Sequence, residues 1–554
     1  MTANIQQDAI ELSQSEPYAK SMEKNEPAAK DFSKSIETDV SPETHSVGDD
    51  EDYPTGLKFW LIILDLGALL VLGGLDNNIV ATTVPSITDH FHTVADIGWY
   101  NSAFRLCSCA FQFVFGRLYK VFSVKLTFML ANTILLVGSI LCSTAVTSTM
   151  FIIGRAVSGI GFAGIIGGVL NIISHIMPLR KRPLYCGMLS GVESAAVIAA
   201  PIVGGALTQS LGWRWCFWIN LPIGGVTLLM TIFLVSDPRP GDPSMTTKQR
   251  LAQLDPISNL LLIPALTSLF IALSWAGIEY SWTDGKVIGP IVTFVVLMAL
   301  FVYYQHVRGE AAALPPRIIG KRSIIAGAVF AIGTNSSINI LEYYLPTYYQ
   351  TVREYSPGSS GYMIIPIIVG SPIGMFLCGF GTSTIGYYTP FMLLASITMP
   401  IFSGLVTTFD ATTSFVRLIL YSGAFGFASG IGFNAPISAV QVVLPIEDVS
   451  LGISIILFAQ QIGPAITMAV AQVIFINRLS TNLIGTISTL DPATIQNSGL
   501  TEIINDVPAA QHMEVLEGIS RSLDETWYLV VGLTCATLIG SLLMEWRSVK
   551  HKKS

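Results

Sequence analysis

The chain has 554 residues, of which 51% are hydrophobic and only 12% are charged, and its mean hydropathy is +0.59. Charged side chains make up about 25% of an average soluble domain, so this composition excludes an ordinary soluble fold. The formal net charge is −7, but residues 1–52 alone hold thirteen acidic and four basic side chains. The remaining 26 basic and 24 acidic residues nearly balance, so no nucleic-acid partner is expected.

Apolar runs follow this acidic tail through most of the chain. Each run is close to the ~20 residues that a helix needs to cross the hydrocarbon core of a bilayer. They predict fourteen transmembrane helices, at residues 59–83, 97–118, 124–145, 149–172, 184–207, 216–235, 255–277, 287–306, 323–346, 361–381, 388–409, 416–440, 450–476 and 526–545. The predicted fold class is therefore an all-α integral membrane protein that lies in the lipid bilayer.

The spacing of the spans predicts an order of six helices, a linking pair and six more. The tail is too polar to bury a core, so we expect it to be disordered. The predicted parts are the acidic tail 1–55, a bundle over 56–235, two linking helices over 236–322, a bundle over 323–545 with a long outer loop 478–525, and a basic tail 546–554.

Basic residues distinguish the two sets of alternate loops. One set, together with the C-terminal tail, holds seventeen Lys and Arg residues, whereas the opposite set holds five. Loops rich in Lys and Arg stay in the cytoplasm, and an even number of spans places both termini on one side. Both termini are therefore predicted to be cytoplasmic.

Asp76, Arg105 and Arg155 are three of the charged residues that fall inside the spans of the first bundle. An ionised carboxylate at such depth costs at least ~2.5–3.5 kcal/mol on insertion scales, so Asp76 should face a cavity or a partner. The three residues are candidates for one proton-coupling cluster. A static buried ion pair that fixes helix packing is the alternative.

The second span also carries a polar stripe, because Asn101, Arg105, Ser108 and Gln112 are spaced to share one helix face. We expect Asn101 and Gln112 to line a substrate cavity.

The fifth span contains Glu193 near its middle and Pro201 further along. Glu193 could carry protons or bind a cationic substrate; a protonated carboxyl bonded to a neighbouring helix explains it equally well. Pro201 removes a backbone donor and bends the helix, and the small residues around it allow a neighbour to approach closely.

The residues around this proline resemble the antiporter motif Gly-x-x-x-Gly-Pro-x-x-Gly-Gly of drug:proton antiporters in the major facilitator superfamily. The positions assigned to the motif are Gly191, Ala200, Pro201, Gly204 and Gly205, with Ala200 where the family has Gly. The stretch from Trp213 to Gly224 resembles the junction into the sixth helix of the fourteen-helix branch. Asp76 and Arg155 match further motifs of that branch.

One loop departs from the family pattern. Residues 116–125 resemble the first cytoplasmic loop motif, but Lys120 stands where an Asp is typical. Gating by that Asp cannot be transferred to this chain. The run Gln441–Val449, by contrast, is similar to fungal members of the branch.

The second bundle carries polar stripes on three predicted helices. Together with Phe and Met side chains they predict a roomy amphipathic cavity; structural hydrogen bonds between helices would explain any one of them. The residues are Asn335, Asn339, Glu342, Asn434, Gln441, Gln460 and Gln461.

No motif predicts catalysis. Residues 159–164 match the dinucleotide pattern Gly-x-Gly-x-x-Gly, but they lie inside a span without a preceding strand, so they are interpreted as close-packing glycines. The seven cysteines fall in or beside apolar spans and are interpreted as buried hydrophobes. We therefore expect neither an enzyme, a cofactor nor a metal.

The resemblance implies a monomeric proton-coupled exporter of drugs or fungal secondary metabolites, such as toxins, in the plasma membrane; a vacuolar or vesicle membrane is the alternative location. Its partners would be a small-molecule substrate and protons. Two other functions stay open: a proton-linked importer of siderophores or amino acids, and a receptor or channel that does not transport.

Overall fold

The computed structural model describes residues 53–92, 96–236, 254–276, 280–312, 314–484 and 511–550. The predicted acidic tail up to residue 52, residues 485–510 of the predicted outer loop and residues 551–554 of the basic tail lie outside the described residues, as does the basic loop 237–253. The described ranges are helical, and their only strand-like pairings are two isolated bridges.

The first group of helices lies between residues 56 and 234. It comprises α3 (Gly56–Phe91), α4 (Ile97–Ala110), α5 (Gln112–Val121), α6 (Val124–Ser143), α7 (Ser148–Ile176), α8 (Arg182–Ser210), α9 (Trp215–Trp218) and α10 (Asn220–Leu234).

The linking pair and the second group follow. They comprise α12 (Pro256–Trp275), α13 (Gly285–Arg308), the short η1 (Gly309–Ala311) and α14 (Pro316–Ile319), then α15 (Arg322–Thr351), α16 (Pro357–Ile385), α17 (Thr389–Val406), α18 (Phe415–Phe433), α19 (Ala435–Val443), α20 (Val449–Ile484) and α23 (His512–Leu543).

Thirteen helical segments of the described residues are long and apolar enough to cross a membrane. The predicted second span is present as α4 and α5, which a single residue, Phe111, separates with φ −89° and ψ 0°. The Phe111 N–H still donates to the carbonyl of Cys107 at 3.0 Å, so no loop intervenes. Together α4 and α5 supply the fourteenth crossing that the hydropathy predicts.

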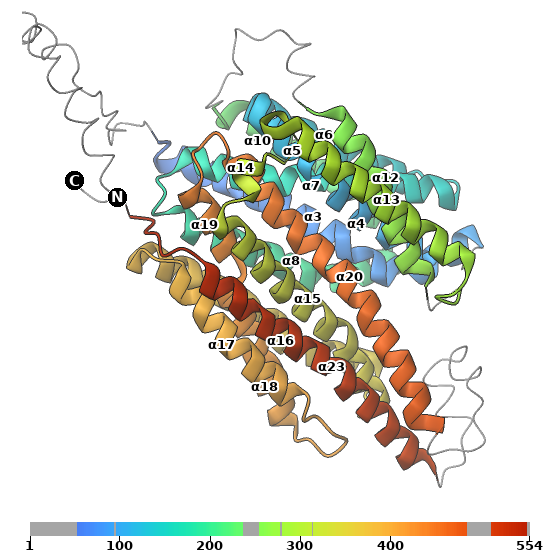
Figure 1. Ribbon diagram of the computed structural model, residues 1–554. Helices are drawn as coiled ribbons and strands as arrows, with labels where there is room; N and C mark the ends of the chain where they lie inside the picture. The colour runs from blue at the N-terminus through green and yellow to red at the C-terminus, as the bar shows by residue number, and fades with distance from the viewer. Residues whose placement is uncertain are drawn as a thin grey trace, which may run out of the picture. The chain divides into compact units, whose positions relative to one another are not determined.

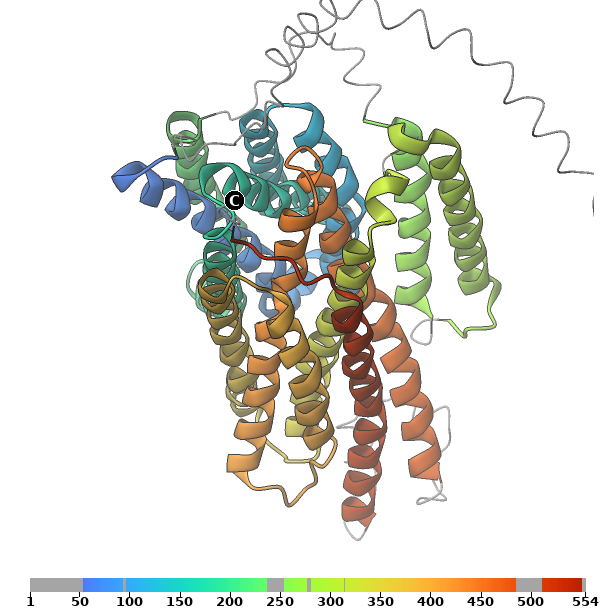
Figure 2. The same ribbon diagram turned by 60° about the vertical axis from the view of Figure 1, so that its left-hand side comes forward.

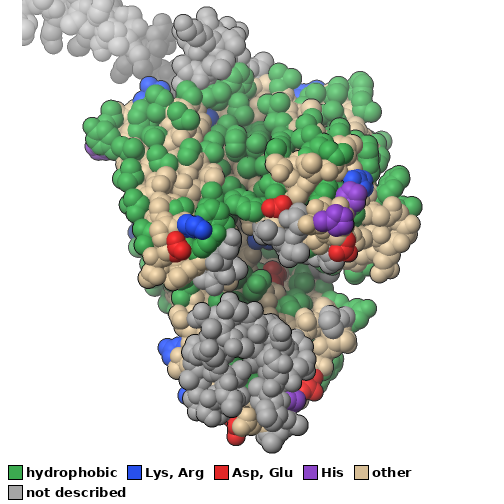
Figure 3. Space-filling model, turned by 90° about the vertical axis from the view of Figure 1, so that its right-hand side faces the viewer, with side chains coloured by type: hydrophobic (Ala, Val, Ile, Leu, Met, Phe, Trp, Pro, Cys, Tyr) green, Lys and Arg blue, Asp and Glu red, His purple; other side chains and the backbone are tan. Residues whose placement is uncertain are grey.

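The outer surfaces of the helices are apolar, as a bilayer requires. Phe233, Leu260 and Tyr303 are 80%, 72% and 69% exposed, values that would be unfavourable for such side chains in water. Hydrophobic side chains cover most of the upper part of the molecule in Figure 3. The described helices therefore form an integral membrane protein.

Each group of six crossings packs as a bundle of its own. In the first bundle α3 packs against α8, and α7 packs against α4 and α6; in the second, α16 packs against α18, and α15 packs against α20 and α23. The most extensive contacts between the bundles are those of α8 with α16 and of α5 with α20, and smaller ones join α20 to α7 and α4, and α8 to α19. The linking helix α12 packs on α13 and also contacts α4 and α20. The labelled helices are seen in Figure 1, and in Figure 2 the green linking pair stands at the side of the molecule, next to the orange-red α20.

Glycines allow several of these helices to touch backbone to backbone. A Cβ on Gly159 would lie 2.2 Å from the carbonyl oxygen of Phe104, and one on Gly161 would lie 2.4 Å from the amide of Leu135. Both distances are far too short for non-bonded atoms. The interpretation of this glycine run as a close-packing element of a membrane helix is confirmed.

Candidate functional site

A cavity of about 880 Å³ lies between the two bundles. Ligand pockets for small organic molecules typically measure ~300–1,000 Å³, so the size suits such a ligand. Phe, Leu and Ile side chains alternate in its wall with nine amide side chains, which are those of Asn77, Asn78, Asn101, Asn335, Asn339, Asn434, Gln460, Gln461 and Gln472. The surface is amphipathic, and it combines apolar contact with many hydrogen-bond donors and acceptors.

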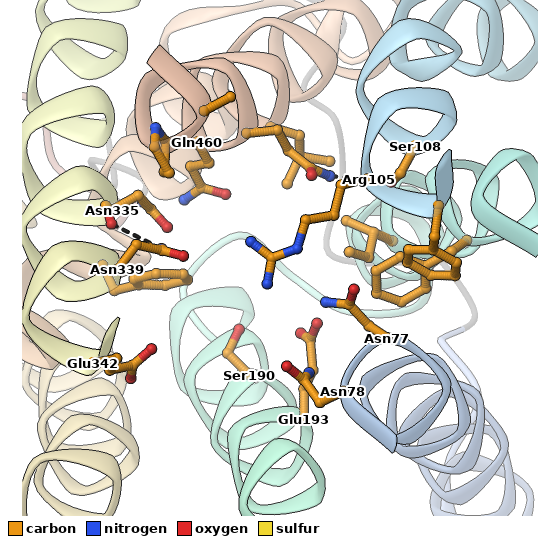
Figure 4. A pocket seen from close by; sticks show the side chains of 18 of the residues that line it. Asn77, Asn78, Arg105, Ser108, Ser190, Glu193, Asn335, Asn339, Glu342 and Gln460 are labelled. Atoms are coloured by element: carbon orange, nitrogen blue, oxygen red, sulfur yellow. Dashed lines mark hydrogen bonds between the residues drawn. The ribbon is translucent and has the colours of Figure 1, made fainter. Parts of the chain in front are cut away.

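Three charged side chains line the cavity: Arg105 on α4, Glu193 on α8 and Glu342 on α15. In Figure 4 the guanidinium group of Arg105 points into the open space, with Glu193 and Glu342 on different sides of it. No ion pair or hydrogen bond within the described residues involves Arg105, and its buried Nε lacks a partner. Arg105 is therefore a free donor group that faces the cavity.

The linking pair contributes to the same wall. Phe270, Leu273 and Ser274, near the end of α12, line the cavity between α4 and α20. Sequence reasoning placed this helix outside the bundles and missed these residues. The hydropathy of a membrane helix does not indicate which of the other helices it packs against, so this contact could not be predicted from the sequence.

Two of the predicted cavity residues lie elsewhere. Gln112 follows the break at Phe111; it is buried, both polar atoms of its amide lack partners, and its Nε2 would lie 3.6 Å from a Cβ on Gly167. Gln441 donates instead to the hydroxyl of Ser174 at 3.2 Å. These placements correct the prediction: equal spacing along one helix does not ensure that all members of a stripe reach the same cavity.

Asp76 and Arg155 form a buried ion pair that does not include Arg105. The Arg155 Nη1 donates to Asp76 Oδ2 at 2.7 Å, and both side chains are fully buried. The amide of Asn220 donates to Asp76 Oδ1 at 2.8 Å, and Arg155 Nε donates to the carbonyl of Tyr100 at 3.0 Å. This network joins α3, α4, α7 and α10 and lies outside the cavity wall, so the predicted single cluster is divided in two.

The helix with the antiporter motif, α8, contacts both bundles. Gly204 packs on α3, where a Cβ would lie 2.6 Å from Ile79, whereas Gly191 faces Pro372 of α16. Ala200 is fully buried, but Pro201 is exposed and no atom lies within 4 Å of a Cβ on Gly205. The half of α8 before the proline therefore packs against α16 of the second bundle, and we call this contact the α8–α16 seam.

Hydrogen-bonded ion pairs close one end of the cavity. We call it the basic end, because the Lys- and Arg-rich loops that are predicted to be cytoplasmic lie there. The Lys120 ammonium group donates to the Asp448 carboxylate at 2.7 Å, and Arg317 of α14 donates to the same carboxylate at 2.5 and 3.0 Å. Burial would raise the pKa of Asp448, but these bonds hold that pKa below its usual value of 3.8. The bond to Asp448 also raises the pKa of Arg317.

Further contacts between the bundles lie at the same end or near the middle. The hydroxyl of Ser450 donates to Asn171 at 2.5 Å, and Ser190 donates to Asn434 at 3.3 Å. Among the described residues, no hydrogen bond joins the bundles beyond the level of Ser194 on α8. Seen from that opposite end, the surface is hollowed (Figure 3), so the cavity is closed at the basic end and opens at the other.

Two helical bundles around a polar cavity that is closed at only one end define a membrane transporter of small molecules. A family model described as Major Facilitator Superfamily matches residues 66–468, and the chain belongs to this superfamily.

Curated relatives agree over almost the whole length. The chain is 41% identical over 532 residues to the "MFS-type efflux pump MFS1" of Arthroderma benhamiae, covering 96% of this chain and 98% of that protein. It is 42% identical over 509 residues to the protein of the same name in Trichophyton rubrum, covering 91% and 95%. It is also 36% identical over 501 residues to "Efflux pump aflT" of Aspergillus parasiticus, covering 90% and 98%.

Among solved structures, the proton:xylose symporter XylE bound to 6-bromo-6-deoxy-D-glucose matches 86% of this chain and 94% of its own, with a TM-score of 0.51. The two chains are 14% identical, so this likeness concerns the fold alone.

Proposed function

We propose that this chain exports small amphipathic organic molecules, such as fungal secondary metabolites, across the plasma membrane in exchange for protons. The names of the relatives as efflux pumps support the direction of transport. The observation that carries the proposal is a cavity between two bundles that holds two carboxyl groups and is closed at the basic end. Both bundles come from one chain, so a monomer contains the whole site.

The transport cycle follows from the position of the contacts. If the basic end faces the cytoplasm, as its loops predict, the present state opens outward. The α8–α16 seam and the bonds of Asp448 separate when the bundles rock to the other state, as in transporters built of repeated bundles. Inward proton movement supplies the energy, since one elementary charge crossing 100 mV yields ~2.3 kcal/mol.

Glu193 and Glu342 are the groups that we propose to load and release protons. Both reach the cavity, and neither forms an ion pair within the described residues. Asp76, in contrast, is sealed against Arg155, so protonating it would leave a buried cation without a partner. We assign Asp76 and Arg155 to helix packing and Arg105 to the substrate.

Proteoliposomes test the proposal. Purified protein is reconstituted with a pH gradient, and uptake of 1,8-dihydroxyanthraquinone, a fluorescent amphipathic molecule, is followed together with internal pH. We expect accumulation that a protonophore abolishes and that Glu193→Gln prevents, while binding of the probe persists. Equal movement without any pH difference or voltage would contradict coupled transport, and co-movement of probe and protons in one direction would indicate an importer.

A further inference from the structure

The charge pattern of the cavity distinguishes it from a site for cations. Arg105 is the only basic side chain among the described residues that line it, and its guanidinium group keeps its charge at every physiological pH. Glu193 and Glu342 are the only acidic ones. When both carboxyls are protonated, the cavity holds one positive charge and no negative charge.

Arg105 is placed to bind something that the chain itself does not supply. Its side chain comes from α4, and it points toward the space between Asn339 on α15 and Asn78 on α3 (Figure 4). Its buried Nε has no hydrogen-bond acceptor in the described residues. A buried guanidinium group without a partner is unfavourable, so an acceptor from a ligand that reaches its end in the open space would be strongly preferred. The planar guanidinium group suits a carbonyl, enolate or carboxylate oxygen.

The carboxyls complete the pattern with acceptors. In the ionised form, Glu193 or Glu342 accepts a charge-assisted hydrogen bond from a hydroxyl group of a ligand, and protonation replaces the carboxylate with a weaker, neutral acceptor. A molecule with a hydroxyl near a carbonyl therefore binds Arg105 and a carboxylate together. Proton loading then weakens one of these two bonds, which is the competition that antiport requires.

We infer that Arg105 selects substrates by a carbonyl or acidic oxygen, preferring hydroxy-carbonyl molecules, and excludes permanent organic cations from the cavity. The inference rests on the proposed function, since it names the substrate class of the same site. A permanent cation would have to lie near Arg105 in surroundings where like charges are poorly screened. Once Glu193 and Glu342 are protonated, the nine neutral amides that remain offer no compensating negative charge.

Equilibrium binding to the purified protein in detergent tests this inference without any gradient. The two probes are 1,8-dihydroxyanthraquinone, which is neutral and has hydroxyls beside a carbonyl, and tetraphenylphosphonium, which is a permanent cation. We expect the unmodified protein to bind the first probe and not the second. Arg105→Gln should weaken anthraquinone binding about 10–100-fold, the size of a lost hydrogen bond to a charged group, and allow the cation to bind.

Two further variants make the result specific. Arg105→Lys retains the charge but loses the planar fork, so it should still exclude the cation while binding the anthraquinone less tightly. Thr293→Ala, which removes a polar group from the exposed face of α13 outside the cavity wall, should leave both affinities within about twofold. Thermal unfolding of each variant in the same detergent establishes that it is folded.

The outcomes separate the two proposals. If the unmodified protein binds the cation as tightly as the anthraquinone, binds neither probe, or loses nothing in the folded Arg105→Gln variant, the selection by Arg105 is overturned. If binding depends on Arg105 but vesicles show no coupled transport, the proposed function fails while the ligand assignment stands.

Discussion

The ammonium group of Lys120 lies 2.7 Å from the carboxylate of Asp448, although 328 residues separate the two in the chain. Lys120 lies in the last turn of α5 in the first bundle, and Asp448 directly precedes α20 in the second. A basic side chain at the end of the first bundle is thus paired with an acidic side chain of the second bundle.

This arrangement predicts how the basic end opens. Asp448→Asn removes the carboxylate that Lys120 and Arg317 share and leaves Arg317 with Glu310 alone, so the closed state loses stability. The native Cys186, buried in the wall of the cavity on α8, should then react faster with a membrane-impermeant maleimide added at the basic end. Labelling is measured in a variant whose other cysteines are replaced.

The matched control exchanges the charges. Lys120→Asp alone should increase labelling as Asp448→Asn does, and Lys120→Asp combined with Asp448→Lys should restore part of the slow rate. Labelling that is unchanged in both single variants would show that the bridge does not hold the closed state.

The same carboxylate predicts a pH dependence of stability. The pKa of Asp448 in the folded protein is lower than its usual value of 3.8. Its ion pairs therefore contribute fully to the stability of the fold above about pH 3.8, and this contribution is lost as the pH falls through the pKa of the folded protein. The unfolding temperature of the unmodified protein should exceed that of Asp448→Asn by a constant amount between about pH 5 and 7. The difference should shrink at more acidic pH. A difference that grows on acidification would contradict the assignment.

Hydropathy was sufficient to predict the crossings and their order, because the cost of exposing backbone and charge to lipid leaves apolar helices as the only solution. It could not predict the contacts between them. Gln112 has the spacing of a cavity residue, yet the break at Phe111 separates it from the rest of the stripe. Arg105 and Arg155 carry equal charge, but only the packing of α4 and α7 decides which of them meets Asp76.

Because Asp76 is paired with Arg155 whereas Glu193 lines the cavity, different roles are predicted for these two acidic residues. Asp76→Asn removes the partner of the buried Arg155, and such a loss typically costs about 3–5 kcal/mol, so the protein should express poorly and unfold at lower temperature. Glu193→Gln keeps the shape of a cavity side chain and should fold normally while losing proton-coupled transport. Size-exclusion profiles and unfolding temperatures in one detergent distinguish the two. A stable Asp76→Asn variant without proton coupling would make Asp76 a proton carrier instead.

The seam between α8 and α16 predicts a steric effect on transport. A Cβ on Gly187 would lie 2.5 Å from the carbonyl oxygen of Met375, so Gly187→Val should force the two helices apart and reduce the transport rate at least tenfold. Gly205→Ala, on the same helix, meets no atom within 4 Å and should leave the rate unchanged. Equal rates in all three proteins would show that close approach at this seam is not needed.

The linking helix α12 predicts a substrate contact outside both bundles. Phe270 lines the cavity from α12, so Phe270→Ala should weaken binding of 1,8-dihydroxyanthraquinone by about 1–3 kcal/mol, the range for losing a buried aromatic contact. Val295 on α13 is 56% exposed on the outer surface, and Val295→Ala should change nothing. Binding is measured by fluorescence titration in detergent. The folded Leu273→Ala variant is titrated in the same way. If both variants bind the anthraquinone as tightly as the unmodified protein does, α12 fills the space between α4 and α20 without contacting the substrate.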